Sequence, residues 1–341
     1  MQFRCNTLQV VTFLAMAELL EVDNLRMRFR TGVGFGARFL SQEDDWIDAV
    51  LDVSFKMTTG QTIALVGESG SGKTTLGRTI IGLLQPQEGS IKFQGTELVG
   101  LGDRDYKPYR RNIGMMFQDP VASLSPRRSV RAQILEPFQV HKYKEQNMDM
   151  EVKRLMSVVG LPERFEGRFP HELSGGQARR VGVARALALS PKIIIADEPT
   201  AGLDVSVQGE VLNLMRGLQS QFSISYLVIT HNLPVVRHTS DRIAIMYLGR
   251  FVEQGSTQSI FNSPAHPYTQ ALLGAVPKPD PKQRRKIISI EGEVPSLRLR
   301  PDGCDFHPRC KYAQARCRSE PPGETKIGSE HTVRCHFPIS G

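Results

Sequence analysis

Four short apolar runs, at residues 62–66, 193–196, 225–229 and 243–246, stand out from a chain that is otherwise mixed in polarity. Runs of this length are typical of strands that are buried on both faces of a sheet. Helical spacing of apolar residues lies between them, most clearly in residues 73–84. Strands that alternate with helices indicate an α/β fold with a parallel core sheet.

Two further patterns predict a smaller antiparallel part and a helical part. Residues 18–29 alternate between apolar and polar positions as a half-buried strand does, residues 50–55 form another strand, and residues 89–93 resemble an antiparallel edge strand. Residues 119–172 contain several prolines and a helical pattern at 150–161 but no buried-strand signal. We therefore expect an antiparallel β subdomain at the edge of the fold and a mostly helical insertion.

The chain length agrees with two domains, since an average domain has roughly 150 residues and this chain has 341. After Ser263, the sequence becomes rich in proline and basic residues. We expect a main domain over residues 16–262 and a small cysteine-containing C-terminal domain over residues 263–341. Residues 1–15 are predicted to be an upstream extension, because Met16 and the residues after it fit the start of the first strand.

Composition excludes two classes of protein. With 40% hydrophobic and 23% charged residues, the chain can bury a core and is not intrinsically disordered. Its apolar runs are far shorter than the roughly 20 residues that a membrane-spanning helix needs.

The net charge of +8 is concentrated in residues 277–341, which contain 13 Lys and Arg residues and 8 Asp and Glu residues. Such a tail can attract nucleic acid, anionic lipid or an acidic protein, or simply be a solvated basic segment.

The segment after the first buried run carries a phosphate-binding motif. Residues 67–74 read Gly-Glu-Ser-Gly-Ser-Gly-Lys-Thr, which fits Gly-x4-Gly-Lys-Ser/Thr, and they lie between a predicted strand and a predicted helix. Backbone N–H groups of such a loop surround a polyphosphate, and the helix N-terminus favours its negative charge. Lys73 is predicted to contact the β- and γ-phosphates of ATP, and the Thr74 hydroxyl to hold Mg²⁺. The predicted ATP-binding residues here are Gly67, Ser69, Gly70, Ser71, Gly72, Lys73, Thr74 and Thr75.

A pair of carboxylates follows the second buried run. Asp197 and Glu198 come directly after residues 193–196, at the carboxyl end of a predicted parallel strand, where α/β sheets place their chemistry. We expect Asp197 to reach Mg²⁺ and Glu198 to polarise the attacking water. Together with the phosphate-binding loop, this pair indicates a nucleotide hydrolase.

A third motif indicates which family of nucleotide hydrolases the chain resembles. Residues 173–177, Leu-Ser-Gly-Gly-Gln, precede the carboxylate pair and open a helix, which makes a second anion site at a helix N-terminus. With the two nucleotide motifs in this order, the chain resembles the ATP-binding subunits of ABC transporters, whose cassette has a P-loop fold. The resemblance implies that this second loop completes the ATP site of another subunit. The residues concerned are Ser174, Gly175, Gly176 and Gln177.

The resemblance assigns roles to further residues. Gln118 matches the glutamine that touches Mg²⁺ and the attacking water and joins the helical insertion. His231 matches the histidine that contacts the γ-phosphate, and Asp204 matches the aspartate of the loop after the carboxylate pair. Phe29 is the best match to the aromatic residue that stacks on adenine, with Trp46 as the alternative. The predicted catalytic residues are thus Glu198, His231 and Gln118, and the predicted Mg²⁺ ligands are Thr74, Gln118 and Asp197.

Three segments point to one branch of the family. Residues 118–127, 266–273 and 303–310 are similar to segments of oligopeptide and dipeptide importers, most closely of the second of their two ATPases. The resemblance implies a sister ATPase subunit, two membrane permeases and an extracytoplasmic binding protein as partners. It also implies a peripheral position at the cytoplasmic face of the bacterial inner membrane, and peptides as cargo.

Four cysteines in the tail raise the question of a metal centre. Their spacing contains no C-x2-C pair, so a zinc ribbon is not indicated. Thiolates suit an iron–sulfur cluster or zinc, and the resemblance favours a 4Fe–4S cluster. Two other interpretations stay open, namely four reduced thiols in a small core, or zinc with His307 or His336. For a bound cluster we expect a structural role, far from Lys73 and Glu198. The four residues are Cys304, Cys310, Cys317 and Cys335.

Two other functions compete with the transport interpretation. An ABC ATPase that acts on ribosomes or DNA would fit the basic tail, but the chain has one cassette and no coiled-coil insertion. A catalytically silent partner in a heterodimer is disfavoured by Glu198, by His231 and by the intact Leu-Ser-Gly-Gly-Gln motif. We therefore expect an ATP-hydrolysing importer subunit and do not expect nucleic acid as a partner.

Overall fold

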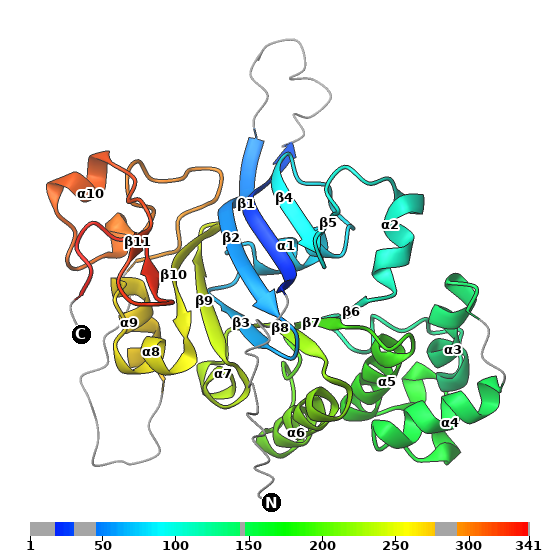
Figure 1. Ribbon diagram of the computed structural model, residues 1–341. Coiled ribbons are helices and arrows are strands. Elements are labelled where there is room, and N and C mark those ends of the chain that lie inside the picture. Colours follow the sequence, from blue (N-terminus) through cyan, green and yellow to red (C-terminus); the bar gives the residue numbers. More distant parts are fainter. Residues whose placement is uncertain (1–17, 31–45, 144–146, 277–291, 340–341) are drawn as a thin grey trace, which may run out of the picture.

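The computed structural model describes residues 18–30, 46–143, 147–276 and 292–339, arranged around two β-sheets (Figure 1). The predicted upstream extension at residues 1–15 lies outside the described residues. In the described part, the larger sheet has eight strands in the order β11-β12-β10-β9-β3-β8-β7-β6, and the smaller has four in the order β2-β1-β4-β5. The parallel core sheet and the antiparallel subdomain expected from the sequence are both confirmed.

The centre of the larger sheet is parallel and contains all four predicted buried strands. In β3 and β7 every residue is buried. Neighbouring side chains of β7 enter different cores: Ile193 and Ile195 pack toward the antiparallel sheet, while Ile194 and Ala196 pack toward the helical insertion. The parallel strands are β6 (Ile113–Met116), β7 (Ile193–Asp197), β8 (Ser225–Thr230), β3 (Thr62–Val66) and β9 (Arg242–Tyr247).

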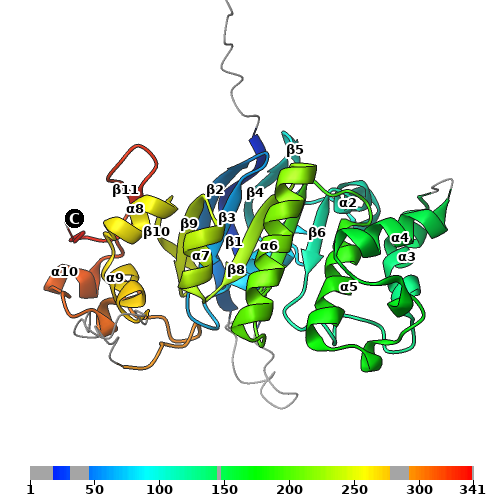
Figure 2. The same ribbon diagram turned by 90° about the horizontal axis from the view of Figure 1, so that it is seen from below.

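Helices cover the two faces of this sheet. α1 lies between the core sheet and the antiparallel sheet, where its Leu76 and Ile80 are fully buried. It ends at Ile80, earlier than the predicted residue 84. α6 and α7 lie on the opposite face, as Figure 2 shows. The bounds are α1 (Lys73–Ile80), α6 (Val205–Phe222) and α7 (Leu233–Thr239).

The antiparallel sheet packs over α1 (Figure 1). Its strand β1 pairs with β2 on one side and with β4 on the other. β4 is not the edge strand that we expected, because the two-residue β5 pairs with its Lys92 and Phe93. A strand of two residues has no alternation that the sequence could reveal. The strands are β1 (Glu18–Arg30), β2 (Trp46–Thr58), β4 (Glu88–Phe93) and β5 (Thr96–Glu97).

A helical unit stands between β6 and α5, on the side of the molecule away from the tail (Figure 2). Its helices share one core with strands β7 and β8 and with α6, and Phe138, Leu155 and Val181 are buried in that core. The predicted helical insertion is therefore confirmed, while its boundaries at 119 and 172 stay predictions. The elements in and around it are α2 (Asp103–Arg110), α3 (Val130–Val140), α4 (Met148–Val158), η2 (Glu163–Phe165), η3 (Pro170–Glu172) and α5 (Gly175–Leu187).

The C-terminal part is joined to the core sheet. β12 pairs antiparallel with β10, with Val333 opposite Glu253, and so extends the sheet. The buried Glu253 carboxylate accepts hydrogen bonds from the backbone N–H groups of Ala265 and His266 and lies 2.7 Å from Nε2 of His331. The division into two domains stays a prediction. The elements here are β10 (Arg250–Ser256), α8 (Thr257–Asn262), α9 (Pro267–Gly274), η5 (His307–Arg309), α10 (Ala315–Ser319), β11 (Thr325–Lys326) and β12 (Thr332–Val333).

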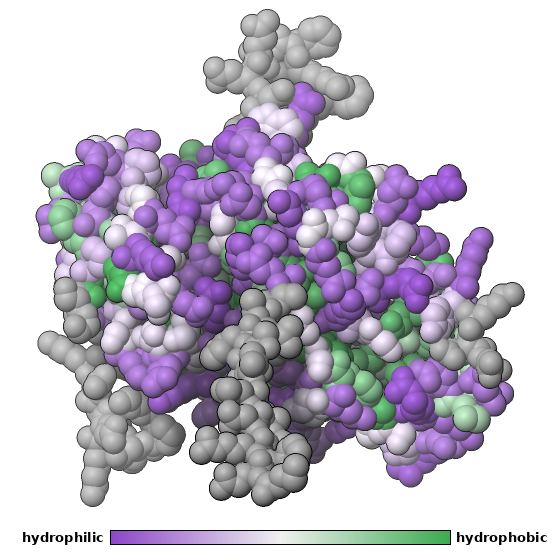
Figure 3. Space-filling model, viewed as in Figure 1, coloured by the Kyte–Doolittle hydropathy of each residue, from purple (hydrophilic) through white to green (hydrophobic). Residues whose placement is uncertain are grey.

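The surface drawn in Figure 3 is largely hydrophilic, with hydrophobic residues concentrated toward the helical insertion. In and beside this insertion, the large side chains of Phe117, Val121 and Phe169 are exposed. Within the described residues, no helix combines the length and the apolarity that crossing a bilayer requires.

Candidate nucleotide site

The predicted phosphate-binding loop connects the buried strand β3 to α1. Two of its glycines are required by the backbone around them. A Cβ atom on Gly67 would lie 2.2 Å from the carbonyl oxygen of Met246. One on Gly72 would lie 2.1 Å from the carbonyl oxygen of Ala49, and Gly72 also has a left-handed φ of 102°. The loop therefore passes so close to neighbouring backbone that only glycine fits at these positions.

Lys73 is folded back onto this loop. Its ammonium group donates hydrogen bonds of 2.8 Å to the carbonyl oxygens of Gly67 and Glu68 and one of 3.3 Å to the Ser71 hydroxyl. Burial lowers the pKa of Lys73, and the negative charges of Glu198, Asp197 and Glu68 oppose that shift. The positive charge is thus surrounded by oxygen acceptors, which a polyphosphate would replace with its own.

The predicted magnesium ligands Thr74 and Asp197 meet at the carboxyl edge of the sheet. The Thr74 hydroxyl lies 3.1 and 3.0 Å from the two carboxylate oxygens of Asp197. Burial raises the pKa of the Asp197 carboxyl, because desolvation disfavours its charged form. A bound cation would offset this effect by stabilising the carboxylate. No group of three or more His, Cys, Asp or Glu side chains in the described segments is arranged to hold an ion. A pair of oxygen ligands still fits Mg²⁺, which usually takes one or two protein oxygens besides phosphates and waters.

Glu198 and His231 also come together at this edge. Glu198 has a left-handed φ of 50°, a conformation that is uncommon for a residue with a side chain. Its backbone N–H donates to the carbonyl of Ile229, which draws the end of β7 to the end of β8. As a result, Oε1 of Glu198 lies 2.7 Å from Nδ1 of His231, whose side chain is 71% exposed. The imidazole ring of His231 is therefore accessible to a ligand and at the same time contacts the Glu198 carboxylate.

Gln118 lies near this edge without joining the contacts. It follows β6, whose Met116 is paired with Ala196 of β7, so it leaves the sheet on the same side as Asp197. Its side chain is exposed. Among the described residues, the hydrogen bonds of the Asp197 and Glu198 side chains involve other partners. The structure therefore does not bring Gln118 into contact with the residues that share its predicted role.

The residues of the second loop are exposed helix caps. The Ser174 hydroxyl accepts a 3.3 Å hydrogen bond from the backbone N–H of Gln177, whose side chain in turn accepts from the N–H of Ser174. In the same way, Asp204 caps α6 by accepting from the N–H of Val207 at 3.0 Å. Ser174 and Asp204 are both exposed. The two helix N-termini that follow them therefore face solvent, where another chain can reach them.

Arg179 belongs to the site although the sequence did not single it out. It is buried in α5 and donates hydrogen bonds to the carbonyl oxygens of Glu198, Pro199 and Ala201, the last at 2.9 Å. Burial lowers the pKa of this guanidinium. Arg179 thus ties the helix that begins at the Ser174 loop to the backbone that carries Glu198. The signal in the sequence was an arginine at a buried position of a helical pattern.

The predicted adenine-stacking residues lie at one end of the antiparallel sheet. Phe29 is opposite Ile47 on the paired strands, and Trp46 is opposite Arg30. Both aromatic side chains are exposed, Phe29 by 40% and Trp46 by 43%. The chain between them, residues 31–45, lies outside the described residues. The choice between the two aromatic residues stays a prediction.

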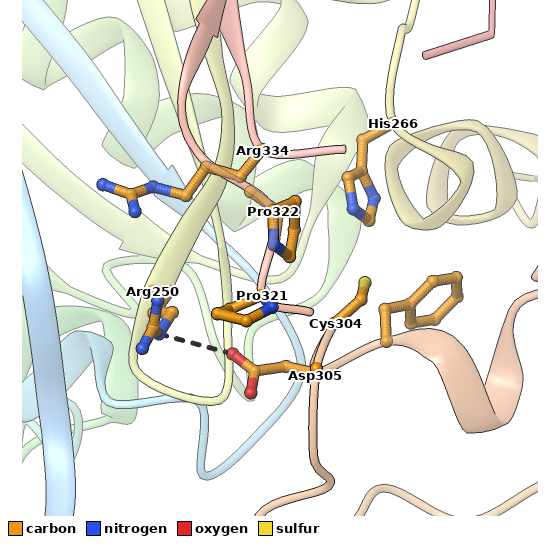
Figure 4. Close-up of a pocket in the computed structure, with 10 residues that line it drawn as sticks. Arg250, His266, Cys304, Asp305, Pro321, Pro322 and Arg334 are labelled. Carbon is orange, nitrogen blue, oxygen red and sulfur yellow. Dashed lines mark ion pairs between the residues drawn. The ribbon is translucent and has the colours of Figure 1, made fainter. Parts of the chain in front are cut away.

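The four tail cysteines line one cavity. Burial raises the pKa of Cys304 to about 12 and that of Cys335 to about 11, and the neighbouring thiols add to both shifts. Cys304 and His266 also border an adjoining cavity, where Figure 4 shows them near the ion pair of Arg250 and Asp305. All four thiols thus border the same cavity, and ligation of a cluster by them stays a prediction. The lining cysteines are Cys304, Cys310, Cys317 and Cys335.

The tail also approaches the nucleotide site more closely than we expected. Arg309, next to Cys310, donates hydrogen bonds of 2.7 and 3.0 Å to the carboxylate of Glu68 in the phosphate-binding loop. The carbonyl of Glu68 in turn accepts from Lys73. That a cluster at the cysteines would lie far from Lys73 stays a prediction. The contact of Arg309 with Glu68 was not expected, because side-chain contacts between distant segments leave no trace in local sequence patterns.

The phosphate-binding loop, the two carboxylates and the capped second loop define an ATPase of the ABC class. Comparison with known families agrees: residues 50–201 match the family described as ABC transporter, and residues 252–317 match the oligopeptide/dipeptide transporter C-terminal region. The chain therefore belongs to the ABC transporter family, as an ATP-hydrolysing subunit, and the predicted cassette fold is confirmed.

Relatives and solved structures support the same assignment. The chain is 47% identical to the oligopeptide transport ATP-binding protein AppF of Bacillus subtilis, over 94% of this chain and 97% of that protein. It is 42% identical to OppF of Salmonella typhimurium, over 93% of this chain and 95% of that protein. The dimeric cassette MJ0796 bound to ADP and Pi matches with a TM-score of 0.62 and 27% identity, over 70% of this chain and 99% of that one.

Proposed function

We propose that this chain supplies the energy for peptide uptake by an ABC importer. The names of its relatives support this cargo: they include oligopeptide transport ATP-binding proteins and a di/tripeptide transport ATP-binding protein, DppF of Pseudomonas aeruginosa. The observation that carries the proposed hydrolysis is the meeting of two pairs, Thr74 with Asp197 and Glu198 with His231, at the sheet edge that holds the phosphate loop.

The residues of this edge divide the chemistry among them. Lys73 exchanges the loop carbonyls for the β- and γ-phosphates of ATP. Thr74 and Asp197 hold Mg²⁺, which when bound neutralises developing charge on the phosphate oxygens. Glu198 orients and polarises the attacking water, and His231 keeps the Glu198 carboxylate in position and reaches toward the γ-phosphate. Gln118 joins them when the helical insertion moves toward the sheet.

The exposed second loop acts on the nucleotide of another subunit. We assign Ser174, Gly175, Gly176 and Gln177, together with Asp204, to an ATP bound by a sister ATPase, because these residues face solvent in this chain. Two ATP molecules then close the dimer, and hydrolysis reopens it. Differential affinity of the open and closed states for ATP and ADP provides the work.

The remaining parts of the system follow from this role. The partners are a sister ATPase, two membrane permeases and an extracytoplasmic binding protein, and the chain sits at the cytoplasmic face of the inner membrane. The adenine ring stacks on Phe29, with Trp46 as the alternative. Both aromatic side chains are exposed and available for this contact.

The tail thiols are proposed to ligate a 4Fe–4S cluster. Four thiols lie around one cavity, and burial together with neighbouring thiols raises the pKa of Cys304, Cys310 and Cys335. A cation bound between the thiols would stabilise their thiolate forms. The free volume between them is about 20 Å³, which holds one water molecule, so ligation would require the side chains to turn away from one another.

Uptake of a labelled dipeptide by cells that carry the complete operon tests the proposed function. Replacing Lys73 with Ala should abolish uptake, since the lysine supplies the positive charge that is proposed to bind the β- and γ-phosphates. Wild-type protein that copurifies and hydrolyses ATP with ribosomes or DNA, but supports no uptake, would instead favour the nucleic-acid alternative.

A further inference from the structure

The carboxylate of Glu68 is held by an arginine from the far end of the chain. Glu68 follows Gly67 in the phosphate-binding loop, and Arg309 lies 241 residues later, in η5. The two guanidinium nitrogens of Arg309 each donate to one oxygen of Glu68, which is the paired geometry that arginine forms with carboxylates. The side chain of Arg309 is only 6% exposed and that of Glu68 25%. This ion pair is thus largely shielded from solvent.

Aromatic residues support both partners of this ion pair. The guanidinium of Arg309 lies 5.9 Å from the ring centroid of Tyr247. The hydroxyl of the fully buried Tyr268 accepts a 3.0 Å hydrogen bond from the backbone N–H of Glu68. Phe306, from the same segment as Arg309, packs against both tyrosine rings, at centroid distances of 5.3 Å. The contact is therefore a built feature of the fold rather than a chance surface pair.

The charge of Glu68 acts at the place where phosphates would bind. The Glu68 carbonyl accepts a hydrogen bond from the Lys73 ammonium group. The Glu68 carboxylate is one of the charges that oppose the lowering of the Lys73 pKa by burial. A polyphosphate bound at Lys73 is an anion. The negative charge of Glu68, which attracts the Lys73 ammonium group, would therefore repel the polyphosphate. Without Arg309, Glu68 would repel the nucleotide that the loop binds.

We propose that Arg309 neutralises Glu68 and thereby sets the affinity of the phosphate-binding loop for ATP. In this role Arg309 is a positioning residue, since it acts on the nucleotide only through Glu68. The inference rests on the proposed ATP site at Lys73. Beyond that site, the C-terminal tail gains a direct electrostatic effect on the binding of ATP.

Equilibrium binding of MgATP to the purified full chain tests this proposal. Arg309→Met should weaken binding about tenfold, the effect of leaving one charge of such a pair uncompensated. The double variant Glu68→Gln with Arg309→Met should recover affinity to within about twofold, because the repelling charge is then absent. The defect of Arg309→Met alone should also shrink as salt is raised from 0.05 to roughly 0.5 M, since salt screens the repulsion.

A second tail arginine provides the matched control. Arg334 forms a 2.7 Å ion pair with Asp52 of β2 and does not touch the phosphate-binding loop. Arg334→Met should leave MgATP affinity unchanged even where it lowers the melting temperature as much as Arg309→Met does. Equal weakening in Arg309→Met and in the double variant, or in Arg334→Met, would overturn the proposal. Binding that survives Lys73→Ala would instead count against the ATP site itself.

Discussion

The nucleotide edge of the sheet and the thiol cavity of the tail differ in what surrounds their ionisable groups: polar partners at the edge and neighbouring thiols in the cavity. At the nucleotide edge, each charged group has a polar partner that a ligand can replace: Lys73 has loop carbonyls, and Asp197 has the Thr74 hydroxyl. In the thiol cavity, burial and mutual repulsion keep Cys304 and Cys335 in their neutral form. At the nucleotide edge, the charged groups can exchange their protein partners for ligand atoms in each turnover. In the thiol cavity, the neutral thiol form is favoured, and a bound cation would shift the thiols toward the thiolate form.

Replacing Glu198 with Gln should have the largest effect and should be confined to the nucleotide edge. A positioned general base contributes about 10²–10⁴-fold to turnover, so ATP hydrolysis should fall by that factor while MgATP binding persists. Steady-state hydrolysis and equilibrium binding, measured on the same preparation, provide the two readouts. Glu210→Gln on the exposed face of α6 is the matched control. Turnover within tenfold of the wild type in Glu198→Gln would remove Glu198 from the base role.

The purified chain alone should be a weak ATPase. Under the proposed function, the loop that completes this chain's ATP site belongs to a second subunit, as the exposed Ser174 loop completes the site of that subunit. Losing such anion contacts typically costs about 10²-fold in turnover. Hydrolysis by the chain alone should be compared with hydrolysis by the complex that contains its sister ATPase and permeases. Full activity without those subunits would count against the heterodimer.

Replacing Glu253 with Gln should destabilise the junction between sheet and tail. The carboxylate is buried and accepts from two backbone N–H groups as well as facing His331, and an amide would turn a donor toward one of them. We expect a loss of about 2 kcal/mol in the free energy of unfolding. Urea denaturation measures it, with Glu320→Gln as control, because the ion pair of Glu320 with Arg316 is exposed and screened by solvent, so its loss should leave the free energy of unfolding nearly unchanged. Equal losses in both variants would show that burial of Glu253 is not what matters.

Replacing Cys310 with Ser should act mainly on the tail and should have the smallest effect on turnover. It should loosen the tail and weaken assembly with the partner subunits, while MgATP binding survives and is weakened no more than in Arg309→Met, because Arg309 adjoins Cys310. Limited proteolysis follows the tail, and iron, sulfide and zinc analysis of anaerobically purified protein follows the ligand. Metal-free wild-type protein with a protease-resistant tail would show that the thiols are core residues only.

The nucleotide edge could be predicted because its residues are set by local motifs. Apolar runs gave the buried strands, and each functional side chain follows one of them, so the common edge of a parallel sheet brings the pairs together. Gln118 shows the limit of this reasoning. Its motif placed it at the correct edge, but contact with Asp197 depends on the position of the helical insertion, which no local pattern determines.

The tail could be predicted only in part, because its contacts join distant segments. Two strands before the tail were missed as well. In β6 only Ile113 and Met116 are buried, so it shows no continuous buried run, and in β10 the buried Glu253 breaks the apolar pattern. Arg309 looked like any basic tail residue, and only its partner Glu68 gives it a role. In the same way, Arg179 gains its function from the backbone carbonyls that surround it.

The pairing of β12 with β10 also affects the solubility of shortened forms of the protein. The tail covers hydrogen-bonding groups of β10 through Glu253 and Gln254, and the N–H of Arg334 bonds to the carbonyl of Val252. A chain that ends near residue 262 would lack β11 and β12 and would leave these groups unpaired at the edge of a six-stranded sheet. Open strand margins recruit one another between molecules, which leads to aggregation. Isolated cassettes of this protein should therefore precipitate at concentrations that the full chain tolerates, and light scattering of the two forms would measure the difference.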